Sequence, residues 1–75
     1  MKIEEIQQRE NLERIAGHFI QGNKTEVRAE IIKQAKKSRS PILASARIVM
    51  DIAEHLRGIS QSHYLSFRAW VANDL

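Results

Sequence analysis

The sequence predicts a small all-α protein, a single-domain bundle of three to four helices over residues 1–75. Its ten isoleucines recur at spacings of three, four and seven rather than two, which is the helical period. Three Gly and one Pro supply few of the tight turns that a small β-sandwich or barrel needs. With no Cys, neither a disulfide nor a thiolate zinc site stabilises so short a chain, and we expect its core to gain from a partner.

The first two expected helices are separated by a glycine. One helix is expected over residues 3–21, and Gly22 ends it in the left-handed C′ conformation. Asn23 or Thr25 then caps a second helix that reaches about Arg39. The apolar faces of the two helices are formed by Leu12, Ile15, Ala16, Phe19 and Ile20, and by Val27, Ile31 and Ala35.

Ser40 and Pro41 predict the start of a third helix over residues 41–57, because Ser is a favoured N-cap and Pro is tolerated at N1. Gly58 is expected to close it. Its apolar arc, centred on Val49, is wider than the ~100° stripe of a surface helix and predicts the central helix of the fold. The expected core is Leu12, Ile15, Phe19, Val27, Ile31, Ala46, Val49, Ala53, Leu56, Tyr64, Phe67 and Val71.

A fourth helix is expected from a cap at Ser60 or Ser62 to about Ala72, and it is apolar on two sides. The side with Tyr64, Phe67 and Val71 should pack on the third helix, because aromatic residues bury more area. The other side would then be exposed in a monomer and available to a second copy or another protein. The interface candidates are Leu65, Ala69, Ala72 and, next to them, Trp70.

Positive charge is concentrated in the second helix. The chain has 12 Lys+Arg against 9 Asp+Glu, and residues 21–40 alone hold six cations against two carboxylates. Four of the cations follow one another closely at Lys33, Lys36, Lys37 and Arg39. Such a cluster binds nucleic-acid phosphates by releasing counterions. A solvated helix end has the same pattern, because the macrodipole favours cations there. Both interpretations stay open.

Residues 52–70 resemble a helix-turn-helix, with a small residue at Ala53, a turn at Gly58 and a polar start to the following helix. The segment departs from that pattern by one extra residue between Ala53 and Gly58, and its second helix carries one basic residue. The resemblance implies contacts to DNA from Gln61, Ser62, His63, Ser66 and Arg68.

Catalytic and cofactor chemistry is not predicted. The three His lie far apart in the sequence, and no nucleophile–base–orienter set is present. Asp51, His55 and His63 are a conceivable ligand set, but an Asp51–His55 pair on the helix surface is the favoured interpretation. We therefore expect no enzyme, no cofactor and no metal.

The first six residues are acidic and lack an apolar segment, so we expect no secretory signal and a cytoplasmic location. No apolar run approaches the ~18 residues of a membrane span. The leading hypothesis is a non-enzymatic regulatory or adaptor protein that binds protein through its helices, as a homodimer. The alternative is a small DNA-binding transcriptional regulator that uses residues 52–70. Salt distinguishes them, because it weakens DNA binding steeply and an apolar interface hardly at all.

Overall fold

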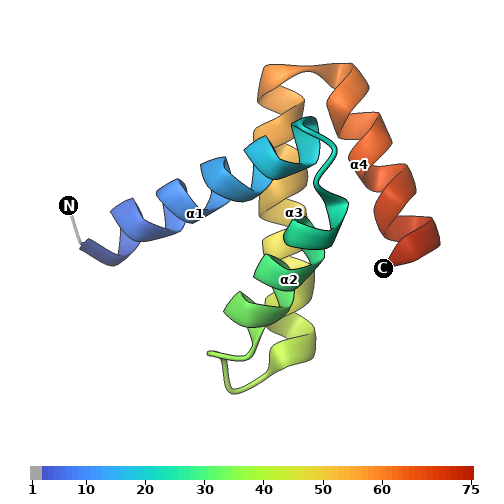
Figure 1. Ribbon diagram of the computed structural model, residues 1–75. Coiled ribbons are helices and arrows are strands. Elements are labelled where there is room, and N and C mark those ends of the chain that lie inside the picture. The colour runs from blue at the N-terminus through green and yellow to red at the C-terminus, as the bar shows by residue number, and fades with distance from the viewer. Residues whose placement is uncertain (1–2) are drawn as a thin grey trace.

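The computed structural model describes the backbone of residues 3–75 and the side chains of residues 8–75. Over this part of the chain it consists of helices without strands, which confirms the predicted all-α bundle. The helices are α1 (Ile3–Ile20), α2 (Lys24–Ala35), α3 (Pro41–Ile59) and α4 (Gln61–Asp74). α2 and α3 lie side by side, α4 turns back alongside α3, and the first half of α1 projects from the bundle (Figure 1).

Gly22 ends α1 as the sequence predicts. Its φ of 85° is left-handed, and its N–H donates to the carbonyl of Phe19 at 3.0 Å. The N–H of Asn23 donates to the carbonyl of His18 at 2.8 Å, which completes a Schellman motif. Asn23 occupies the N-cap position of α2, although its side chain makes no capping hydrogen bond there. The reversal between α1 and α2 is therefore fixed by backbone bonds at one glycine.

α2 is shorter than expected, because it ends at Ala35 rather than near Arg39. The N–H of Ser38 donates to the carbonyl of Ala35 at 3.0 Å, so the helix tightens into a turn. The hydroxyl of Ser38 then accepts the N–H of Ser40 at 3.2 Å. Pro41 disfavours a helical conformation at Ser40 and begins α3 at its N1 position.

The expected end of the third helix at Gly58 is wrong, because α3 continues to Ile59. Glycine accepts helical angles as readily as turn angles, so its presence alone does not end a helix. The N–H of Ser60 still donates to the carbonyl of Leu56 at 2.8 Å. Ser60 then adopts an extended conformation, and it is the single residue that connects α3 to α4.

The core lies where all four helices meet, and it is centred on aromatic and branched residues. Phe19, Phe67 and Trp70 form an aromatic cluster with ring centroids 5.1–5.9 Å apart. Aliphatic residues from the first three helices surround it. The buried set is Ile15, Ala16, Phe19, Val27, Ile31, Ala35, Ile52, Leu56, Phe67 and Trp70. The burial predicted for Ile15, Phe19, Val27, Ile31, Leu56 and Phe67 is thereby confirmed.

The part of the core from α3 and α4 differs from the expectation. Ala46 is exposed and Val49 half-buried, whereas Ile52 and Leu56 form the buried line of α3. Trp70 is 6% exposed, so its expected place on the exposed side of α4, next to Leu65, Ala69 and Ala72, is wrong. Trp70 follows Phe67 by three positions, and both face the core on the same side of α4. The rotation of α4 about its axis therefore buries the larger aromatic ring.

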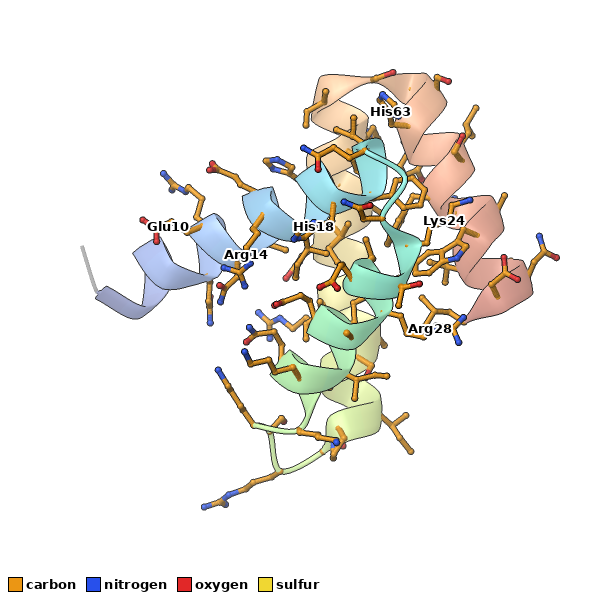
Figure 2. All side chains as sticks on the ribbon, viewed as in Figure 1. Glu10, Arg14, His18, Lys24, Arg28 and His63 are labelled. Atoms are coloured by element: carbon orange, nitrogen blue, oxygen red, sulfur yellow. The ribbon has the colours of Figure 1, made fainter. Side chains whose placement is uncertain are left out.

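Tyr64, Leu12, Ala53 and Val71 are half-buried, and the last three pack against the core from its margin. On the outside, the guanidinium of Arg28 donates to the backbone carbonyl of Asp74 and so ties α2 to the end of α4 (Figure 2). A cation is favourable at this place because a helix C-terminus carries partial negative charge. Among the described residues, no helix has both the length and the apolarity needed to cross a membrane.

Candidate protein-binding surface

The first half of α3 carries the most exposed apolar side chains of the described residues. Ile42 is 84% exposed, Leu43 71% and Met50 67%, and Ala46 between them is exposed as well. We call these four residues the α3 strip. A difference in helix length accounts for the exposure of Ile42 and Leu43, because α4 has 14 residues and α3 has 19. At about 1.5 Å per residue, α4 is shorter by about 7.5 Å, so the first five residues of α3 extend beyond its end.

A groove between α3 and α4 continues the α3 strip. It has a volume of about 440 Å³, and Met50 belongs to both features. Its floor is formed by core and marginal residues, and its walls by the facing sides of the two helices. The residues of this α3–α4 groove are Val49, Met50, Ala53, Glu54, Tyr64, Phe67, Arg68, Val71 and Ala72.

The rim of the groove is polar and carries both signs of charge. On α4, Arg68 donates to the hydroxyl of Tyr64 at 3.1 Å, and its guanidinium carbon lies 5.7 Å from the centre of that ring. On α3, Glu54 lies 3.5 Å from the guanidinium of Arg57. An apolar floor with a balanced polar rim is typical of protein-binding surfaces.

The interface candidates on α4 occupy different places. Leu65 is 56% exposed, and Ala69 and Ala72 are exposed too. Of these three, Ala72 lines the α3–α4 groove. Trp70 is in the core. The α3 strip itself is absent from the sequence-based candidates, because the wide apolar arc of this helix was assigned to burial.

The nucleic-acid candidates fall into two separate groups. Lys33, Lys36, Lys37 and Arg39 are exposed at the end of α2 and in the turn after it. Gln61, Ser62, His63, Ser66 and Arg68 lie on α4, with His63 close to the α3–α4 connection (Figure 2). The α2–α3 turn and the α3–α4 connection are at opposite ends of α3 (Figure 1). With 19 residues in α3, they are about 28 Å apart.

The helix-turn-helix resemblance is not confirmed by this geometry. The expected turn residues Gly58 and Ile59 belong to α3, and Ser60 alone connects the two helices. A helix-turn-helix uses a turn of three to four residues, which sets its second helix across the first. Here α4 runs back alongside α3 and buries Phe67 and Trp70 (Figure 1).

The histidines lie on three different helices, with His18 on α1, His55 on α3 and His63 on α4. Over the part of the chain that the structure describes, no three side chains of His, Asp or Glu come close enough to hold a metal ion. The conceivable set of Asp51, His55 and His63 is therefore not assembled here.

An ion pair joins α1 to α2 on the outside of the bundle. The Arg14 guanidinium lies 2.9 Å from the Glu30 carboxylate (Figure 2 labels Arg14). Its hydrogen bond and its charge lower the pKa of Glu30, and Lys33 and Gln34 act in the same direction. Partial burial opposes them by raising that pKa; this effect is smaller than that of the hydrogen bond from Arg14 but larger than that of the Arg14 charge. The pair orients two helices and faces neither the α3 strip nor the groove.

No protein-family model, no curated protein and no solved structure matches this chain. The function is therefore inferred from the residues of the α3 strip and the α3–α4 groove themselves.

Proposed function

We propose that the protein is a non-enzymatic adaptor or regulator that binds protein through the α3 strip and the α3–α4 groove. The observation that carries the proposal is the exposure of Ile42, Leu43 and Met50, each by two thirds or more, on one helix. Exposed apolar area costs free energy in water, at roughly 25 cal/mol per Å². Contiguous apolar patches on small soluble proteins accordingly mark interaction sites.

The shape of the surface favours a helix as its occupant. The strip and the groove run along α3, with an apolar floor between polar edges at Glu54 and Arg68. An amphipathic helix presents apolar residues at i, i+3 or i+4, and i+7 to such a groove. The charged edges then contact the polar flanks of that helix and set its direction.

A photo-crosslinking amino acid in place of Met50 tests this function in an extract of the native host. We expect a covalent adduct whose partner is identified by mass spectrometry, and no adduct from the same group at Ser66, which is exposed on α4. Adding Ala46→Glu to the Met50 probe should abolish the adduct, because the new carboxylate lies in the strip. Nuclease treatment should leave it intact. Equal labelling from both positions would reject the proposal.

A second candidate, binding of nucleic acid, is favoured by one observation. Lys33, Lys36, Lys37 and Arg39 are all exposed, and none of them takes part in an ion pair with a described residue. Phosphates could therefore reach them without breaking an existing contact. Gln61, Ser62 and His63 lie near the other end of α3, and Arg68 lies at the α3–α4 groove. This second function is therefore limited to backbone contacts from the basic cluster.

A further inference from the structure

Building on the protein-binding function above, we propose that the occupant of the α3 strip is a second copy of this chain. The two α3 helices run antiparallel about a two-fold axis at the level of residue 48. An isologous contact of this kind requires a self-complementary surface, because the same residues face each other from both sides. The size pattern and the charge pattern along α3 both meet that requirement.

The size pattern alternates large and small side chains. Leu43, Ala46, Met50 and Ala53 follow one another at spacings of three, four and three, which is the heptad spacing of paired helices. About a two-fold axis at the level of residue 48, Leu43 lies opposite the partner's Ala53, and Ala46 lies opposite the partner's Met50. Each large side chain thus meets a small one, which is the condition for interdigitation without a void.

The charge pattern gives the direction of the partner helix. Arg47 and Glu54 are exposed and lie seven residues apart, so they share one edge of the strip. In an antiparallel pair, like edges of the two helices meet. With the axis at residue 48, Arg47 and the partner's Glu54 lie on this shared edge five residues apart along the helices, which is about 7.5 Å and can be spanned by two long side chains. Glu54 and the partner's Arg47 are related in the same way. A parallel pair in register would lose this match, because it brings this edge beside the opposite edge of the partner helix, where Ile42 and Val49 lie.

Charge exchange tests the pairing directly. Sedimentation equilibrium of the wild type, from micromolar to millimolar concentration, should show an association to twice the mass of 8.6 kDa. R47E and E54R should each weaken it roughly tenfold, because two attractions become repulsions. The double variant R47E/E54R should restore it. Mixing the two single variants should produce a heterodimer, because every charge of one then meets its opposite on the other.

The outcomes separate this proposal from the broader function. S66E is the control and should associate like the wild type, and circular dichroism of every variant should keep its helical signal. A wild-type chain that stays monomeric at millimolar concentration would overturn the dimer, as would failure of the double variant to recover association. If the Met50 probe still captured a different, identified protein, the binding function would stand and the self-pairing alone would fall.

Discussion

The rings of Phe19 and Phe67 meet edge to face, with centroids 5.1 Å apart and planes inclined at 88°. The pair joins α1 to α4 and closes the bundle across its first and last helices. Trp70 lies 5.8 Å from Phe19 and 5.9 Å from Phe67, and it covers both rings. Edge-to-face aromatic pairs add about 0.5–1.5 kcal/mol beyond the area that they bury. The aromatic cluster is therefore the part of the core least tolerant of truncation.

Phe67→Ala should lower the free energy of unfolding by about 3–5 kcal/mol, because it removes a fully buried ring and leaves a cavity. A domain of this size has only about 4–11 kcal/mol to lose. We expect the cooperative urea transition, followed by circular dichroism, to shift strongly or to disappear. The control is Leu65→Ala on the exposed side of the same helix, which should cost less than about 1 kcal/mol. Equal losses from both variants would contradict the orientation of α4.

The helices were predictable from local patterns, whereas the rotation of α4 was not. The spacing of Phe67 and Val71 identifies an apolar face, but Trp70 extends that face on one side and Leu65 on another. Which of them is buried depends on the angle at which Ser60 sets α4 against α3. That angle results from packing among all four helices, so it cannot be predicted from the spacing of apolar residues in the sequence.

The candidate surface was missed for a related reason. Periodicity shows how wide the apolar arc of α3 is, but it does not show how much of that arc the neighbouring helices cover. Coverage depends on where α4 ends, and the first turns of α3 lie beyond that end. The sequence therefore identifies Ile42 and Leu43 as apolar residues, but it does not show that they are exposed.

Alanine substitutions at two of the glycines should change the stability of the fold in opposite directions. Gly22→Ala should destabilise the protein by about 1 kcal/mol, because its φ of 85° is strained for any residue with a Cβ. Gly58→Ala should stabilise it by about 0.5–1 kcal/mol, because Gly58 lies inside α3 and Ala is the better helix former. An added Cβ meets no atom within 4 Å at either position, so new side-chain contacts contribute to neither stability change. Thermal unfolding of the two variants measures both shifts, and a shift of the same sign in both would refute the explanation.

Ile52 and Val49 offer a test of where the core of α3 lies. Ile52 is fully buried, so Ile52→Asp places a carboxylate without partners in the core and should unfold the chain. Val49 is half-buried at the groove, where a carboxylate can reach water. Val49→Asp should therefore keep a cooperative melt at lower stability. Far-ultraviolet circular dichroism with temperature distinguishes the two variants. If Val49→Asp unfolded the chain and Ile52→Asp did not, Val49 rather than Ile52 would lie at the centre of the core.

The ion pair of Arg14 and Glu30 makes stability depend on acid pH. Because the pKa of Glu30 is lowered in the folded state from an ordinary value near 4.5, its contribution is present above that value. The contribution is lost as the pH falls through the folded pKa. Arg14→Gln should raise the pKa of Glu30 towards its ordinary value, as measured by carbon NMR titration of the carboxyl group. Since the Arg14 side chain is 46% exposed and water screens the pair, we expect a stability loss well below about 1 kcal/mol at neutral pH. An unchanged Glu30 titration would show that Arg14 is not the cause.

The basic cluster is tested by charge removal at matched positions. The triple change of Lys33, Lys36 and Lys37 to Gln should leave the fold intact, because all three side chains are exposed. If the cluster binds phosphates, affinity for duplex DNA should fall for every sequence, and the slope of log K against log salt should flatten by about 3. Fluorescence anisotropy over a salt series measures both quantities.

The control replaces Arg9, Lys24 and Arg57 by Gln, which removes the same charge from other exposed places. If the control weakened binding as much as the cluster variant, the attraction would come from net charge and not from a site. If the wild type showed no DNA affinity at low salt, the nucleic-acid function would be rejected.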